Sequence, residues 1–183
     1  AFTMRIRIPS LGPRATSGSA AVEFAMIAPI FLLLLFAILE VALSFCADQI
    51  LTNAVIETGR LVRTGQAQQQ NMSASQFRAA LCNKINYLLS CDGSKLYIDV
   101  RSFATFGAAS YPAPLDGAGN LSPDLNSYQP GGSSDVAGAN TIVLIRAFYK
   151  WQLLTPMVAA HFANMANNTR LLSASVAFRN EPY

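Results

Sequence analysis

The side chains that could do chemistry in this sequence are three cysteines, one histidine and ten acidic residues. The histidine, His161, lies in a segment from 136 to 180 that holds no Asp or Glu, so no acid is nearby to orient it as a general base. The cysteines and the histidine lack zinc-ligand spacing. Gly117-Ala-Gly119 does not fit a P-loop or dinucleotide pattern. We therefore expect no enzymatic activity, no cofactor and no metal site.

Cys82 and Cys91 are the candidates for a disulfide. In a continuous helix they would stand about 13 Å apart, which is too far to bridge. A turn at residues 90–93 would bring them together, and an oxidising compartment would allow a bridge that stabilises the fold by roughly 3 kcal/mol. We expect this disulfide, with two free thiols as the alternative. Cys46 has no nearby partner and is expected to be a small buried hydrophobe.

A nearly continuous apolar segment runs from Gly18 to Ala47. From Phe24 to Leu39 it contains no charged residue, so it is close to the roughly 20 residues that an α-helix needs to cross a bilayer. Residues 1–18 carry three arginines, Arg5, Arg7 and Arg14, and no acidic residue. By the positive-inside tendency this end stays in the cytoplasm and residues 48–183 are exported.

The small residues that a processing protease would accept lie at 15–21, before the apolar segment rather than after it. A cut there leaves the apolar helix on the mature protein, unlike the cut of a secretory signal peptide. Glycine before the cut, at Gly18, lets an enzyme approach the backbone without a Cβ in the way.

The spacing of Gly18, Glu23 and Phe24 resembles a class III prepilin peptidase site. The sequence AVEFAMIAPIFLLLLFAILEVA resembles the TadE-like minor pilins of the tight-adherence (Tad, or Flp) pilus. The carboxy-terminal segments FYKWQLLTP and SASVAFRNEPY are similar to the pattern of that family. The resemblance covers roughly residues 15–65 and 141–183. It implies that Gly18 is the last leader residue, that Ser19 is the new amino terminus, and that Glu23 pairs with the amino group of a neighbouring subunit.

Two acids and a proline mark the apolar helix. Glu23 would also complement the positive end of the helix dipole, which is compatible with a subunit contact. Glu40 stands roughly 24 Å beyond Phe24 and is expected to extend to the outer interface, with an intersubunit contact as the alternative. Pro29 lacks an N–H, so a bend is expected near residues 25–29.

The periodicity predicts one long helix at about 20–64, ended by Gly65 and a polar run, and a second amphipathic helix that starts at Ser73. Alternating segments near 96–101, 143–151 and 172–179 predict a small antiparallel sheet with one covered face. A helix is expected from Pro156 to about residue 167. Residues 104–140, rich in Gly and Pro, are expected to be a mobile exposed loop, with a recognition surface as the alternative.

These observations predict an α+β protein with a long amino-terminal transmembrane helix. Its expected regions are a basic leader at 1–18, a helix at 19–65 that spans the membrane at about 24–47, and an exported domain at 66–183. The resemblance implies a minor pilin of the bacterial inner membrane, cut by prepilin peptidase, with other pilins and the assembly platform as partners. The alternatives are a type II secretion pseudopilin and an uncleaved, membrane-anchored periplasmic binding domain.

Overall fold

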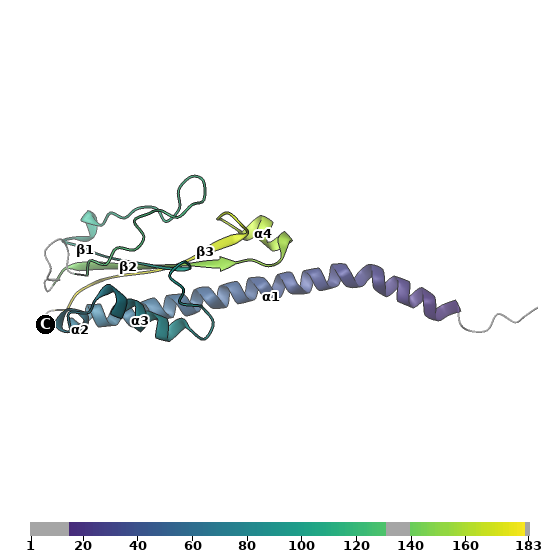
Figure 1. The fold of residues 1–183 in the computed structure, drawn as a ribbon, viewed down its shortest axis with the longest axis horizontal. Helices are drawn as coiled ribbons and strands as arrows, with labels where there is room; N and C mark the ends of the chain where they lie inside the picture. Colours follow the sequence, from purple (N-terminus) through teal and green to yellow (C-terminus); the bar gives the residue numbers. More distant parts are fainter. Residues whose placement is uncertain (1–14, 131–139, 182–183) are drawn as a thin grey trace, which may run out of the picture.

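The computed structural model describes residues 15–130 and 140–181, so the expected basic leader lies largely outside the described residues. A single helix, α1 (Ala15–Arg63), begins a few residues before the predicted start and passes through Pro29 without interruption. Figure 1 shows it as a long rod whose amino-terminal part, in purple, extends beyond the rest of the molecule and is bent. The bend fits the loss of a backbone hydrogen bond at proline.

A three-stranded antiparallel sheet lies along the carboxy-terminal half of this rod (Figure 1). Its strands are β1 (Leu96–Phe103), β2 (Ile142–Gln152) and β3 (Thr169–Arg179), in the order β1-β2-β3. Ile145, in the middle of β2, pairs with Val100 on one side and Val176 on the other. The predicted α+β class, with a long helix followed by a small antiparallel sheet, is therefore confirmed.

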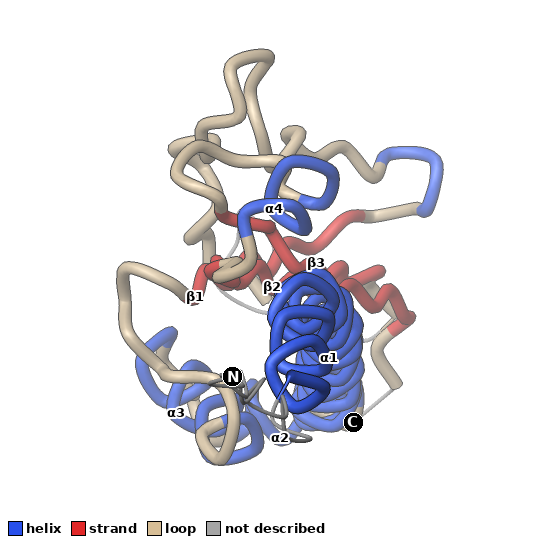
Figure 2. The backbone as a smooth tube through the Cα atoms, turned by 90° about the vertical axis from the view of Figure 1, so that its right-hand side faces the viewer, coloured by secondary structure: helices blue, strands red, loops and turns tan. Residues whose placement is uncertain are grey.

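The helices α1 and α3 (Ala74–Ile85) form a layer beneath the sheet, which Figure 2 shows end on. The alternating side chains of the strands place their apolar members on this helix-facing side. The core between the layers contains Leu51, Val55, Phe77, Leu81, Val100, Val143 and Ile145, among others. Gly59 sits where α1 comes closest to the sheet, since a Cβ there would lie only 3.2 to 3.3 Å from Phe178, Ile145 and Val176.

The chain turns back from α1 through a glycine in the left-handed region. Gly65 has φ 75°, and the polar run after it forms one short helix, α2 (Gln66–Gln69), before α3 begins. The serine start predicted for α3 is present as a complete capping box. The hydroxyl of Ser73 accepts from the backbone N–H of Gln76, and the Gln76 side chain accepts from the Ser73 N–H.

Residues 104–130 differ from the expected mobile exposed loop. They cover the face of the sheet that points away from α1, and Figure 2 shows them as a separate upper layer. Leu125 is fully buried there against Phe148 and Leu171. Val100 in β1 accepts from the Gln129 N–H at 2.7 Å and donates to the Ser127 carbonyl at 2.7 Å. The sheet therefore has two covered faces rather than one; residues 131–139 of the predicted loop lie outside the described residues.

The helix that starts at Pro156 is shorter than predicted. α4 (Pro156–Phe162) ends about five residues early, because the chain turns there to enter β3. Asn167 and Asn168 both adopt positive φ angles of 59° and 54°, which asparagine tolerates better than most residues. The side-chain oxygen of Asn164 also accepts the N–H of Leu171 at 2.8 Å, which fixes the turn.

Candidate functional site

The predicted processing and assembly residues lie in the first turns of α1, far from the sheet. The Ser19 hydroxyl donates to a Glu23 carboxylate oxygen at 3.2 Å, as expected for residues one helical turn apart. A Cβ added at Gly18 would meet no atom within 4 Å. Phe24 is 73% exposed. Among the described residues, this end of α1 is therefore exposed.

Beyond Glu23, the surface of α1 is apolar and largely uncovered. We call residues 18–46 of α1 the protruding segment. An apolar stretch of this helix has a mean hydropathy of 2.7, and none of its residues is buried inside the molecule. The length and composition are those of a helix that could cross a membrane. Cys46, expected to be buried, is exposed among the described residues.

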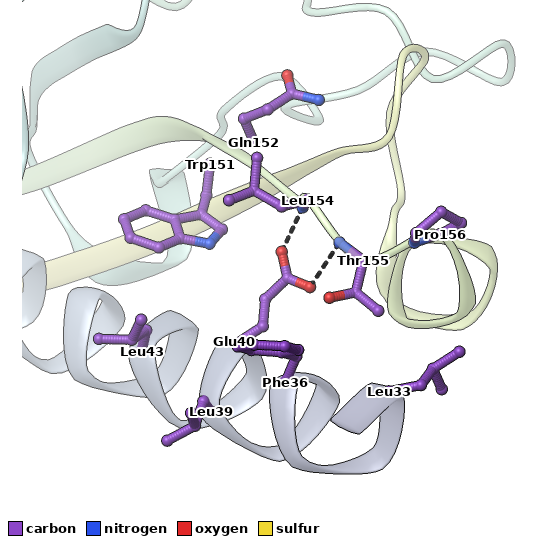
Figure 3. A pocket seen from close by; sticks show the side chains of 10 residues that line it. All are labelled: Leu33, Phe36, Leu39, Glu40, Leu43, Trp151, Gln152, Leu154, Thr155 and Pro156. Carbon is purple, nitrogen blue, oxygen red and sulfur yellow. Dashed lines mark hydrogen bonds between the residues drawn. The ribbon is translucent and has the colours of Figure 1, made fainter. Parts of the chain in front are cut away.

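Glu40 has a role that the sequence did not predict. Its two carboxylate oxygens accept the backbone N–H groups of Leu154 and Thr155, the second at 2.9 Å, just before α4 starts (Figure 3). The first N–H groups of a helix have no partner within the helix, and they attract a negative charge. Glu40 thus ties the protruding segment to the end of β2 instead of extending freely to an interface. We call this contact the Glu40 clamp.

The only sequence signals for this contact were an acid in an apolar helix and a Thr-Pro helix start more than 100 residues later. Thr155 is the N-cap of α4 but makes no side-chain cap hydrogen bond. Glu40 instead accepts the N–H groups of Thr155 and of the residue before it, so it binds the chain just ahead of Pro156. A groove of about 550 Å³ opens beside the clamp, with Phe36, Leu43 and Trp151 among the side chains around it (Figure 3).

A buried ion pair lies under the 104–130 layer. Asp99 in β1 and Arg146 in β2 face each other in register and are 1% and 4% exposed. The Asp99 carboxylate accepts from Arg146 Nε at 3.0 Å and from Arg101 Nε at 2.9 Å. Arg146 also donates to the Pro112 carbonyl at 2.8 Å. These contacts use the charges to attach the covering layer to the sheet, and we assign them a structural role.

Cys82 and Cys91 are joined by a disulfide in this structure, with their Cα atoms 5.7 Å apart. The helix α3 ends at Ile85, and the chain turns before Cys91, which brings the two sulfurs together. Among the described residues, no three His, Cys, Asp or Glu side chains are grouped so as to hold a metal ion. His161, on α4, is exposed.

The fold is an α+β unit in which a sheet packs on the carboxy-terminal half of a long helix. The apolar amino-terminal half of that helix carries two acidic residues, Glu23 and Glu40. Residues 18–60 match the family model of TadE-like proteins. This match confirms the predicted resemblance to TadE-like proteins over the segment that contains Gly18, Glu23 and Glu40. No curated protein and no solved structure matches the chain.

Proposed function

We propose that this protein is a minor pilin of a Tad (Flp) pilus, made as a precursor and cut between Gly18 and Ser19 by a prepilin peptidase. The observation that carries the proposal is the protruding segment, which is apolar, is uncovered except where α4 packs on it, has Glu23 near its amino-terminal end, and matches the TadE-like family model. A membrane-spanning helix presents such a surface to lipid, and an assembled pilus presents it to neighbouring helices.

The orientation follows from charge. The arginines before Gly18 keep that end in the cytoplasm, so the sheet and its covering layers lie in the periplasm, or outside the cell once the subunit enters a pilus. The large sheet-containing part that follows the helix supports a role as a minor pilin rather than the major one. Such a minor pilin would act in pilus initiation or at the pilus tip and would support adherence. The partners are other pilins, the prepilin peptidase and the inner-membrane assembly platform.

Glu23 is the residue on which assembly depends in this proposal. After cleavage, the Ser19 amino group of one subunit would pair with the Glu23 carboxylate of the next in a poorly solvated setting. Removing one partner of such a pair is strongly destabilising, on the order of 3 to 5 kcal/mol, so the pair can fix the register between subunits. Within the part of the chain that the structure describes, Glu23 makes an exposed contact with Ser19 and is accessible.

The test is complementation of a strain lacking the gene, with protein level, leader cleavage and pilus number measured together. Glu23→Gln should insert and fold, because the amide oxygen can still accept from Ser19 and the sheet lies far away, but it should lose co-purification with other pilins and lose piliation. Glu57→Gln, the same change beyond the protruding segment, should keep both. Normal piliation by a stable, cleaved Glu23→Gln protein would restrict the glutamate to a helix-end role. Normal pili in the deletion strain would overturn the assembly function and favour an anchored periplasmic binding domain.

A further inference from the structure

The short helix α4 carries apolar side chains on both of its sides. Val158 and Ala159 are buried and pack on Ala37 and Val41 of the protruding segment. On the other side, Met157 is 58% exposed, and the neighbouring Leu154 and Phe162 are 84% and 39% exposed. Apart from His161, the exposed side chains of α4 are apolar, whereas a helix that only closed the fold would turn mainly polar side chains outward.

The position of α4 along α1 gives its depth relative to the membrane. At about 1.5 Å per residue, Ala37 and Val41 lie roughly 21 and 27 Å beyond Glu23. If Glu23 marks one edge of a hydrocarbon core about 30 Å thick, both residues are still within the core. α4, which packs directly on them, therefore lies at the depth of the leaflet nearest the sheet. The alternative arrangement, with α4 in water, would require the helix to leave the hydrocarbon about six residues early, before Ala37.

We infer that α4 and the turn before it are a second membrane contact, with Leu154, Met157 and Phe162 inserted among the acyl chains of that leaflet. The inference rests on the membrane insertion of α1 proposed above. It makes the protein a single-span anchor with an additional interfacial helix, and it fixes how the sheet stands on the membrane.

Two apolar grooves flank α4 and support a lipid as the occupant. The groove beside the Glu40 clamp has a volume of about 550 Å³, and the groove on the other side of α4 has about 510 Å³. The second is lined by Ile30, Leu34 and Ile38 of α1 together with Met157 and Phe162. Both are continuous with the surface that α1 itself presents to lipid, so acyl chains that cover α1 also fill them.

The positive charge of Arg170, beside the carboxy-terminal end of α4, suits a lipid headgroup. The guanidinium of Arg170 lies 5.4 Å from the ring centre of Phe162 and 6.0 Å from that of Phe45. Phe45 is roughly 33 Å beyond Glu23, which is just outside the hydrocarbon core. Trp151, at the edge of the first groove, is of the residue type enriched at this boundary. An arginine at this depth, in a segment without acids, can meet lipid phosphates.

The experiment uses full-length protein with Cys46 replaced by serine, reconstituted into vesicles of phosphatidylethanolamine and phosphatidylglycerol. Single cysteines labelled with the fluorophore NBD are placed at three exposed positions by Met157→Cys, Phe31→Cys and Ser175→Cys. Quenching by iodide in water is compared with quenching by lipids that carry a doxyl group at shallow or deep positions. Circular dichroism checks that each labelled protein is folded.

We expect the probe at 157 to be quenched by the shallow lipid quencher and to show a several-fold lower iodide quenching constant than the probe at 175. The probe at 31 should be quenched most by the deep lipid quencher. If 31 is in lipid and 157 behaves like 175, the interfacial contact is overturned while the membrane anchor stands. If 31 is also open to iodide, the anchor itself is wrong. If raising the protein-to-lipid ratio removes lipid quenching at 157 without exposing it to iodide, a neighbouring copy is the occupant and the lipid assignment is overturned.

Discussion

Glu40 shows how one carboxylate can be accommodated in an apolar helix. An uncompensated charge among apolar side chains is costly, and so are backbone N–H groups without acceptors. The Glu40 clamp satisfies both, because the carboxylate takes the two N–H groups at the start of α4 that have no acceptor within the helix. Glu40 thereby offsets its own charge within the apolar helix and also supplies acceptors for the two N–H groups just before α4.

Gly18 offers a clean test of processing. In the structure an alanine at 18 would meet no atom within 4 Å and lie in a helix that favours it over glycine, so Gly18→Ala should not impair folding or insertion. It should nevertheless slow cleavage by a cognate prepilin peptidase, because the added Cβ obstructs the enzyme at the cut. Pulse-chase labelling with intact-mass analysis measures the rate, and wild type should start at Ser19.

A matched control is Gly93→Ala, which also adds a Cβ to open space, outside the helix. It should be cut at the wild-type rate. Wild-type cleavage of Gly18→Ala, or only full-length protein from the wild-type chain beside an active peptidase, would remove the assigned cut site.

At the scale of elements, the covering layer of residues 104–130 is held to the sheet and to the helix layer by different contacts. The Asp99–Arg146 pair attaches it to β1 and β2, and Tyr128 attaches it to the helices. The Tyr128 hydroxyl donates to the Met72 carbonyl at 3.0 Å, between α2 and α3, and its ring packs on Phe77. A segment rich in glycine and proline is thus fixed in place by contacts at its two ends.

This arrangement predicts a specific alkaline sensitivity. Burial raises the pKa of Tyr128 from 10.0 to about 12. Below about pH 10 the Tyr128 hydroxyl is protonated in both the folded and the unfolded protein, so its contribution to stability is fully present. Between about pH 10 and 12 it loses its proton more readily in the unfolded protein, so this stability is lost as pH rises. Thermal unfolding followed by circular dichroism should therefore show stability falling over that window in wild type.

Tyr128→Phe should be slightly less stable at neutral pH, because the Met72 carbonyl loses a donor, by about 1 kcal/mol. It should lose less stability than wild type between pH 10 and 12. Tyr87→Phe, which changes a tyrosine that is 71% exposed, is the control and should keep the wild-type profile. Parallel alkaline profiles for wild type and Tyr128→Phe would contradict the assignment.

The elements that could be predicted from the sequence are those with a local period. In the strands apolar and polar residues alternate, as at Leu96, Ile98 and Val100. The start of α3 is indicated by the capping residues Ser73 and Gln76. Residues 104–130 have no such period, and what orders them is distant: Leu125 is buried only because Phe148 and Leu171 lie on the outer face of the sheet. The early end of α4 was missed for a similar reason, since its turn depends on the pairing of β3.

At the candidate site the same limit applies. Gly18, Ser19, Glu23 and Phe24 could be proposed as site residues from the sequence because their spacing along one helix is local. The contact of Glu40 with Leu154 and Thr155 joins residues more than 100 positions apart, and neither a period nor a motif reveals it. The disulfide could be predicted from the sequence because Cys82 and Cys91 are only nine residues apart and the chain reverses between them.

At the scale of the whole molecule, the Glu40 clamp and α4 connect the protruding segment to the sheet. Glu40→Gln can accept only one of the two N–H groups, and it loses the charge that strengthens both hydrogen bonds. A hydrogen bond to a charged group contributes about 1.5 kcal/mol at the lower end of its range, which corresponds to about tenfold in a local opening equilibrium. We expect amide hydrogen exchange from 154 to 162 to accelerate by about that factor in detergent micelles.

The middle of β2 should exchange at the wild-type rate in the same protein, which separates local loosening from global unfolding. Glu57→Gln breaks an exposed contact with Lys84 on α3 and should leave α4 unaffected. Unchanged exchange at Leu154 and Thr155 in Glu40→Gln would mean that packing of Val158 and Ala159 alone holds α4.

The carboxy-terminal end of the described chain returns to the end of α1 that lies farthest from Gly18 (Figure 1). The N–H of Glu181 donates to the Arg63 carbonyl at 3.0 Å, and the two side chains form an ion pair at 3.1 Å. Glu181 therefore lies at the pole of the described molecule that is opposite Gly18. A fluorescent tag carried at this pole would stand clear of Gly18 and α4, which makes it a practical reporter of where each copy of the protein lies in a living cell.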